Sequence, residues 1–232
     1  MTYVFIWDFD GVIVHTPHED AWRMASEVYG IRDFNHEFYM KYVSGRPRLE
    51  GGKMILDLFG YYESHGISDE ETKNKILQEF VELKNNIFRE LIEQNIYEVN
   101  WDVINFILRA RSKGIIQVLA SASRNALPIA YRILLPNNIT LVSLFDINSS
   151  GSGSTKEEVF RNGLNMVLKK YGEIKCGIVF DDAPSGILAG KRLGLKTVGY
   201  GNDSLKESGA DIVINEFSNL DPLNLINILG CD

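Results

Sequence analysis

Residues 2–14 have the sequence TYVFIWDFDGVIV, an apolar run that ends abruptly in two aspartates and a glycine. The run from Tyr3 to Trp7 has the length and composition of a buried β-strand. Burying a carboxylate at a strand end is costly unless it has a partner, and Asp8 and Asp10 follow this strand directly. A divalent cation such as Mg²⁺, which takes oxygen ligands, is a suitable partner. Taken alone, Asp-x-Asp-Gly is equally compatible with a polar turn.

Similar short apolar runs recur later in the chain and are separated by segments of helical character. Such alternation predicts an α/β fold with a parallel sheet covered by helices. The four later runs span residues 115–120, 176–180, 197–200 and 211–214.

The first interval between strands is different, because about a hundred residues pass without a clear strand. A connection of that length must contain structure of its own. We therefore predict a Rossmann-like core formed by residues 1–14 and 98–232, with an inserted α-helical cap and its hinge segments at residues 15–97.

The clearest helix of the predicted cap follows Ser68, which we expect to be its N-cap in a capping box with Glu71. The simpler interpretation of its apolar stripe is packing inside the cap itself, and the alternative is a face that binds a partner. The stripe consists of Ile76, Phe80, Leu83, Ile87 and Leu91.

Polar side chains stand directly after three of the predicted strands. They are Asp8, Ser121 and Asp181. Ligands of open α/β sheets bind beyond the carboxyl ends of the strands, so we expect these three residues to converge at one edge of the sheet. This convergence indicates a functional site.

Four stretches, taken in order, resemble the motifs of the haloacid dehalogenase-like hydrolases. They are DFDGVIV at residues 8–14, LASASRN at 119–125, Lys156, and VFDDAPSG at 179–186. The chain is most similar to the branch that contains β-phosphoglucomutase and small-molecule phosphatases, whose members carry a helical cap inserted after the first motif. The Pro that usually follows the third-motif lysine is replaced by Glu157, which puts the local turn in doubt.

The resemblance implies a nucleophile and an acid/base for phosphoryl transfer. Asp8 would attack phosphorus to form an aspartyl-phosphate. Asp10 would protonate the leaving oxygen and later deprotonate the attacking water or hydroxyl. Lys156 would balance the charge of Asp8 and the phosphoryl group, although a lysine in a polar loop is also compatible with simple solvation.

The expected cofactor is Mg²⁺. Its ligands would be Asp8, the backbone carbonyl of Asp10, and Asp181 or Asp182, with the choice between the last two left open. By itself an Asp-Asp pair is typical of a turn or a helix cap. The family motif often has Glu-Asp here, so Asp181 is a conservative departure with a shorter reach.

Phosphate binding is expected at Ser121, the backbone N–H of Ala122, and Gly11, where the backbone can turn tightly. Ser121 could instead only cap the following helix. Arg124 matches a position that contacts substrate in the mutases, and a surface role is the alternative.

The predicted cap offers two further candidates for substrate binding. His18 lies four residues before Trp22, a spacing found in relatives whose histidine reaches the active site. Arg46 lies in the loop Gly45-Arg46-Pro47-Arg48, and arginine binds phosphate bidentately. A surface histidine and solvated arginines are the alternatives.

Charge and cysteine content narrow the class of protein. The 24 basic and 31 acidic residues give a net charge of −7, which disfavours nonspecific binding of nucleic acid.

Two cysteines do not make a disulfide framework or a zinc site. We expect Cys176 to be a buried small hydrophobe and Cys231 to lie on a loose tail. No secretory or membrane-spanning segment is apparent. We expect a cytoplasmic protein with no membrane partner, monomeric by default.

The predicted function is therefore Mg²⁺-dependent hydrolysis of a small phosphorylated metabolite through an aspartyl-phosphate. A sugar phosphomutase is the enzymatic alternative, because it shares the core residues and differs in excluding water. A non-catalytic binding protein on the same fold is the third possibility.

Overall fold

The computed structural model describes residues 2–231. The chain divides into two compact units, one formed by the residues up to 15 together with those from 98 onward, and the other by residues 16–97. Each unit is described by itself.

A six-stranded sheet forms the centre of the first unit, in the order β10-β9-β8-β1-β4-β7. Every adjacent pair in it is parallel. This confirms the predicted α/β class, and the five predicted strands all lie in the sheet. The sixth strand was not predicted, because it is only two residues long. The strands are β1 (Thr2–Trp7), β4 (Ile116–Leu119), β7 (Ile147–Asn148), β8 (Ile174–Asp181), β9 (Lys196–Tyr200) and β10 (Ile212–Ile214).

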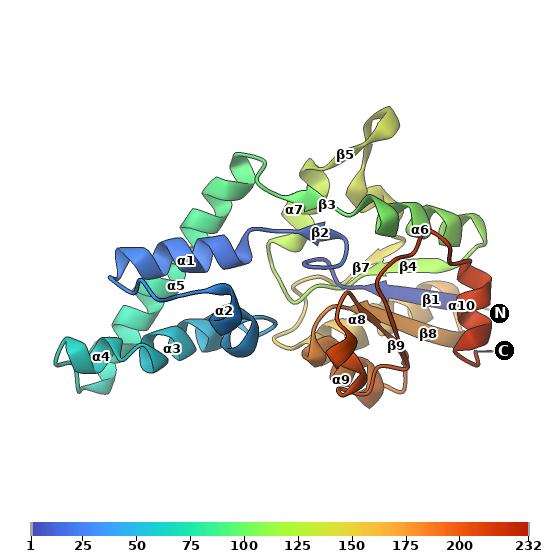
Figure 1. Ribbon diagram of the computed structural model, residues 1–232. Helices are drawn as coiled ribbons and strands as arrows, with labels where there is room; N and C mark the ends of the chain where they lie inside the picture. Colours follow the sequence, from blue (N-terminus) through green and yellow to red (C-terminus); the bar gives the residue numbers. More distant parts are fainter. Residues whose placement is uncertain (1, 232) are drawn as a thin grey trace. The chain divides into compact units, whose positions relative to one another are not determined.

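Both faces of β1 are buried, as expected for a central parallel strand. Val4 and Ile6 belong to a cluster with residues of α8 (Lys156–Tyr171) and α9 (Pro184–Arg192). Phe5 and Trp7 lie in an aromatic cluster that includes Phe106 of α6 (Trp101–Ser112). Figure 1 shows α8 and α9 on one side of the sheet and α6 on the other, and α10 (Pro222–Ile228) packs against α6.

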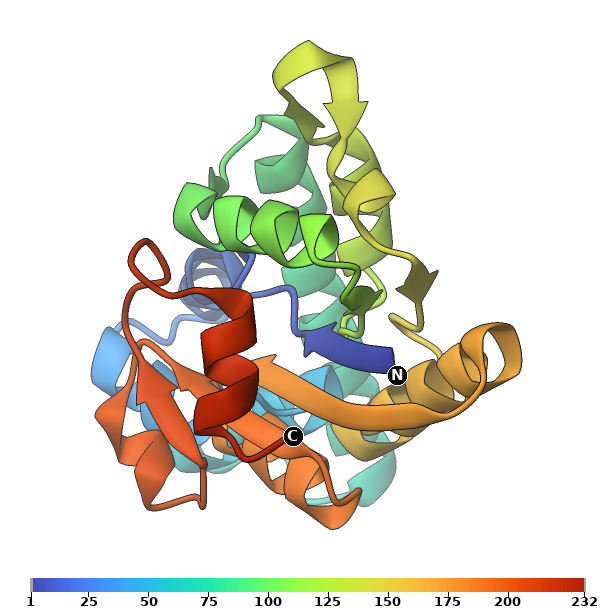
Figure 2. The same ribbon diagram turned by 90° about the vertical axis from the view of Figure 1, so that its right-hand side faces the viewer.

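The remaining elements of this unit are short. The ribbon of β2 (Val14–His15) and β3 (Glu98–Val99) is antiparallel and joins the two places where the chain leaves and re-enters the unit. After α7 (Ala126–Arg132), a second antiparallel ribbon of β5 (Leu134–Leu135) and β6 (Ile139–Thr140) follows, which Figure 2 shows at the top. Three 3₁₀ turns complete the unit, at Pro136–Asn138, Leu141–Leu144 and Asp203–Lys206.

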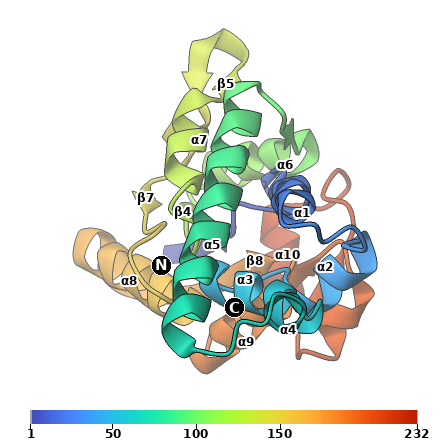
Figure 3. The ribbon, with the colours of Figure 1, turned by 90° about the vertical axis from the view of Figure 1, so that its left-hand side faces the viewer.

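Residues 16–97 are helical. The longest helix, α5, begins at Glu70 with Asp69 as its N-cap, so the predicted N-cap Ser68 was wrong by one residue. Asp69 accepts a hydrogen bond from Thr72 N at 2.8 Å. The helices are α1 (His18–Val28), α2 (His36–Tyr42), α3 (Arg48–Leu58), α4 (Tyr61–Ser64) and α5 (Glu70–Glu93), seen together in Figure 3.

The predicted stripe of α5 packs inside this unit, as the simpler interpretation had it. Phe80 is fully buried beside Trp22, and Ile76, Leu83 and Ile87 pack against the same core. The most buried line of α5 runs through Phe80, Lys84 and Phe88, so it includes a lysine that the predicted stripe did not contain.

No described helix is long and apolar enough to cross a membrane.

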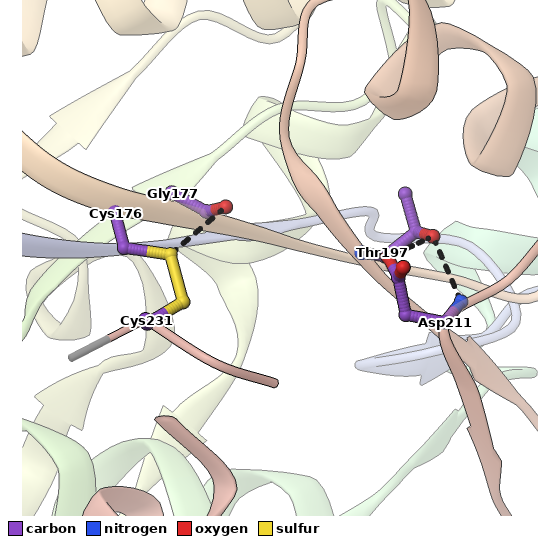
Figure 4. Close-up of a disulfide and its surroundings, with 5 residues drawn as sticks. All are labelled: Cys176, Gly177, Thr197, Asp211 and Cys231. Carbon is purple, nitrogen blue, oxygen red and sulfur yellow. Dashed lines mark hydrogen bonds between the residues drawn. A yellow bond between two sulfur atoms is a disulfide. The ribbon is translucent and has the colours of Figure 1, made fainter. Parts of the chain in front are cut away.

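Cys176 and Cys231 form a disulfide, which corrects the expectation that they stay unpaired. Cys176 lies in β8 and Cys231 follows α10, 55 residues later (Figure 4). Cys231 is 6% exposed, so it does not lie on a loose tail. A pairing across that separation depends on the sheet bringing the start of β8 beside the end of the chain, which two isolated cysteines in a sequence do not reveal.

Candidate active site

Asp8 and Asp10 lie at the carboxyl end of the central strand, where the chain makes a tight turn. Asp8 N donates to Phe180 O at 3.0 Å, which keeps Asp8 in line with β8. Gly11 has φ +81°, and a Cβ there would lie 1.9 Å from Asp182 Oδ2. Only glycine allows both this backbone conformation and the close approach of Asp182.

Lys156 brings two of the aspartates together. Its Nζ lies 2.5 Å from Asp8 Oδ2 and 2.7 Å from Asp181 Oδ2. Thr155 accepts a hydrogen bond from Glu158 N and so caps α8, which places Lys156 at the first position of that helix. The side chains of Lys156, Asp8 and Asp181 are 12%, 6% and 0% exposed, so this ion pair is shielded from water and Lys156 is not merely solvated.

The second acidic motif is fixed by the start of α9. Asp181 ends β8, and its Oδ1 accepts a hydrogen bond from Ala183 N at 3.0 Å. Gly186 packs directly on this carboxylate, since a Cβ there would lie 1.9 Å from Asp181 Oδ2. Both oxygens of Asp181 are therefore held, one by Lys156 Nζ and the other by Ala183 N.

Burial perturbs the ionisation of these groups. Burial raises the pKa of Asp8 well above its ordinary value; Lys156 opposes the rise, and Asp181 and Asp182 add to it. Burial, followed by the charge of Asp181, raises the pKa of Asp182 to about 7. Burial alone would lower the pKa of Lys156, but Asp181 and Asp8 outweigh it and raise that pKa, so the lysine stays charged. More negative than positive charge is gathered here, which favours a cation.

The arrangement suits a divalent metal. Asp8, Asp181 and Asp182 each offer a carboxylate oxygen, and these atoms all lie within 4.8 Å of one another. Asp8 Oδ1 is buried and has no hydrogen-bond partner among the described residues, as a metal ligand's oxygen would. The cluster does not include the carboxylate of Asp10, whose predicted ligand atom is its backbone carbonyl.

Ser121 follows β4, the strand next to β1, by two residues. Trp7 is paired with Leu119, and Ala120 N donates to Trp7 O at 2.9 Å, so Ser121 and Asp8 both follow the carboxyl ends of adjacent strands. Ser121 is 2% exposed, and its Oγ accepts from Ser123 N at 3.1 Å. It therefore closes a local turn; α7 begins later, with Asn125 as its N-cap, so Ser121 does not cap it.

The other candidates divide between the two units. Ala122 and Arg124 follow Ser121 and are exposed. His18 and Arg46 belong to residues 16–97. Arg46 is exposed, 4.0 Å from Glu50, and His18 is partly buried with its ring stacked on Phe88 at 4.2 Å.

Lys84 is a residue that the sequence analysis missed. It is 4% exposed, and its Nζ lies 2.8 Å from His18 Nδ1. Its Nζ also lies over the ring of Phe88, at 4.8 Å. The sequence carries a signal for it, a lysine four residues from Phe80 and from Phe88 on one helix face.

Comparison with known proteins establishes the family. A model of haloacid dehalogenase-like hydrolases matches residues 3–194. The chain belongs to the haloacid dehalogenase-like hydrolases. This confirms the resemblance carried by the four motifs.

Solved structures from this family cover the whole chain. A β-phosphoglucomutase from the hyperthermophile Pyrococcus sp. strain ST04 is 46% identical over 100% of both chains, with a TM-score of 0.89. A β-phosphoglucomutase from Clostridium difficile is 25% identical, covering 99% of this chain and 98% of that one, with a TM-score of 0.75. Both similarities include the helical unit as well as the sheet.

A shorter similarity links the chain to a yeast enzyme. Glycerol-1-phosphate phosphohydrolase 1 of Saccharomyces cerevisiae is 40% identical over 65 residues. The matched segment spans 26% of this chain and 26% of that protein, so it covers only part of the relative's length.

Proposed function

We propose that this protein is a Mg²⁺-dependent phosphatase that hydrolyses a small phosphorylated metabolite, such as a sugar phosphate, through a phosphorylated Asp8. The observation that carries the proposal is the state of the Asp8 carboxylate. One of its oxygens is paired with Lys156 at 2.5 Å, and the other is buried without a partner among the described residues. A carboxylate held in this way is positioned to act as a nucleophile.

The reaction then takes two steps. First, an oxygen of Asp8 forms a bond to phosphorus while the bond to the leaving oxygen breaks, and Asp10 gives that oxygen a proton. Second, water attacks phosphorus and gives a proton to Asp10, the Asp8–phosphorus bond breaks, and inorganic phosphate leaves. Asp10 ends as it began, protonated for the next cycle.

Both steps bring negative charge to a site that already holds three carboxylates. Lys156 offsets part of it, and we assign Asp181 the task of holding Lys156, because both Asp181 oxygens are already engaged. Asp8, Asp182 and the backbone carbonyl of Asp10 would hold Mg²⁺. When bound, the ion supplies the positive charge that lets Asp8 approach a phosphate.

Binding of the substrate is assigned to the remaining candidates. The phosphoryl oxygens would be contacted by Ser121, the amide of Ala122, and Gly11, which follow the carboxyl ends of β4 and β1. Arg124, His18 and Arg46 would contact the rest of the substrate.

A sugar phosphomutase is a second candidate, favoured by a specific observation. The Pyrococcus protein that is 46% identical over its full length is a β-phosphoglucomutase. The hydrolase family and the partial yeast match favour water as the acceptor instead. A mutase would use the same Asp8 and Asp10 and pass the phosphoryl group to a sugar hydroxyl.

The deciding experiment is ³¹P NMR of the purified protein with Mg²⁺ and a panel of phosphorylated metabolites that includes β-glucose 1-phosphate and glycerol 1-phosphate. Growth of free phosphate at the expense of one compound is the expected result. Conversion of one sugar phosphate into its isomer, with little free phosphate, would establish the mutase. No change in any resonance across the panel would favour a non-catalytic protein.

Asp8→Asn is the control for the active site. We expect it to lower turnover by at least about 10³-fold, because the amide is a poor nucleophile, while the fold is retained. Circular dichroism checks the fold. Turnover that persists unchanged in this variant would show that the activity does not pass through Asp8.

A further inference from the structure

We propose that Asn100 is a positioning residue for Asp10, because it holds the turn that carries Asp10 against the rest of the first unit. The inference rests on the proposed role of Asp10 in proton transfer. Asn100 lies ninety residues away in sequence, just after β3, where the chain returns from residues 16–97.

The turn after Asp10 closes on itself through its amides. Ile13 N and Val14 N both donate to Phe9 O at 3.0 Å, and Gly11 N donates to Val14 O at 2.9 Å. These bonds fix the shape of the turn. They do not attach it to its surroundings, because donors and acceptors all lie within residues 9–14.

The pairing of Val14 with Val99 in the β2–β3 ribbon attaches the end of the turn, and Asn100 extends this attachment to two consecutive carbonyls. Its side-chain Nδ2 donates to Val12 O at 3.0 Å, and its backbone N donates to Ile13 O at 2.9 Å. Val12 and Ile13 are both fully buried, so their carbonyls need partners within the protein. Asn100 satisfies both of them.

Asn100 is itself held on two further sides. Its Nδ2 also donates to Tyr200 Oη at 2.8 Å, and its side-chain oxygen accepts from Val103 N at 3.4 Å as the N-cap of α6. The Tyr200 ring stacks on Phe217, which is fully buried. The turn is thereby tied to α6 and to the end of β9.

The consequence for catalysis is positional. Proton transfer requires Asp10 to stand within hydrogen-bond distance of the leaving oxygen, and small misplacements are costly. The chain departs toward residues 16–97 only a few residues after Asp10, and Asn100 fastens the turn before that departure. Asn100, together with the β2–β3 pairing, therefore helps to keep Asp10 in place where the chain departs.

The test uses three variants of the full chain. Asn100→Asp keeps an oxygen that can cap α6 and accept from Tyr200, but when ionised it no longer donates to Val12 O. Tyr200→Phe removes only the hydroxyl. Asp221→Ala is the matched control, because Asp221 is also an N-cap, of α10, accepting from Leu223 N and Asn224 N away from the turn.

Two measurements separate positioning from stability. We expect Asn100→Asp to lower kcat by about tenfold or more with KM changed by less than about twofold, because proton transfer rather than binding is affected. We also expect faster hydrogen exchange at the amides of Gly11, Ile13 and Val14. Tyr200→Phe should show both effects to a smaller degree, and Asp221→Ala neither.

An Asn100→Asp protein with parental kcat and parental exchange in residues 9–14 would overturn the proposal. If Asn100→Asp does not fold, Tyr200→Phe decides in its place. If the parent protein transfers no phosphoryl group, the proposed function fails, and the exchange measurement still decides whether Asn100 fixes the turn.

Discussion

At the scale of single residues, the site is defined by buried carboxylates whose pKa values the fold raises. Burial raises the pKa of Asp182 to about 7 and that of Asp8 well above its ordinary value, 3.8. Between pH 4 and 7 the folded protein therefore binds more protons at these residues than the unfolded chain does. Stability from such groups is fully present at low pH and is lost as pH rises toward the raised pKa.

We accordingly predict that the free energy of unfolding of the metal-free protein falls as pH rises from about 4 to about 7. Urea unfolding in the presence of a chelator, followed by circular dichroism, measures it. Asp182→Asn should flatten this dependence, because the variant lacks one of the two groups. Asp203→Asn, at a side chain that is 77% exposed, should leave the slope as it is. A slope that Asp182→Asn does not change would contradict the assignment.

At the scale of elements, α9 approaches the acidic motif so closely that one position admits only glycine. Helix propensity alone favours alanine over Gly186 by about 1 kcal/mol. The Cβ would lie 1.9 Å from Asp181 Oδ2, so Asp181 would have to leave Lys156. We predict that Gly186→Ala lowers kcat by about 10²-fold, since catalytic groups would be displaced by about an ångström.

Gly190→Ala is the matched control on the same helix. Its Cβ would lie 2.7 Å from Thr197 Cγ2, in packing that does not involve the carboxylates. We expect a lower melting temperature with kcat retained. Equal losses of kcat in the two variants would show that any disturbance of α9 abolishes activity, and the specific role of Gly186 would fall.

The elements also show how far the sequence carries the prediction. The central strand was predictable because an apolar run from Tyr3 stops at Asp8, and alternation of runs and helices indicated the parallel sheet. The short β7 was not predictable, because two residues show no periodicity. Asn100 was missed for another reason: its contacts to Val12 and Tyr200 join residues that lie far apart in the sequence. The local sequence marks such an asparagine only as a helix N-cap.

Side-chain partners were predictable only where a motif supplied them. The four motifs predicted that Asp8, Lys156 and Asp181 share one site. In the structure, carboxylate oxygens of Asp8 and Asp181 both lie within hydrogen-bond distance of Lys156 Nζ. Lys84 belongs to no motif, and its contact with His18 depends on how α1 and α5 pack. Packing of this kind is a property of the folded unit and not of a short stretch of sequence.

At the scale of the whole molecule, the disulfide closes the last part of the chain into a loop. It joins Cys176 of β8 to Cys231, beyond α10, across 55 residues. Closing a loop of this length restricts the unfolded chain. In the chain-entropy model this stabilises the folded state by about 4 kcal/mol, and measured values are commonly about 2–4 kcal/mol.

We predict that Cys231→Ser lowers the free energy of unfolding by about 2–4 kcal/mol. Urea unfolding with and without dithiothreitol measures it, and the reductant should bring the parent down to the level of the variant. Cys176→Ser should have the same effect, and the double variant should be no less stable than either single one. A parent protein that is indifferent to the reductant and no more stable than Cys231→Ser would show that the bond does not contribute to stability in solution.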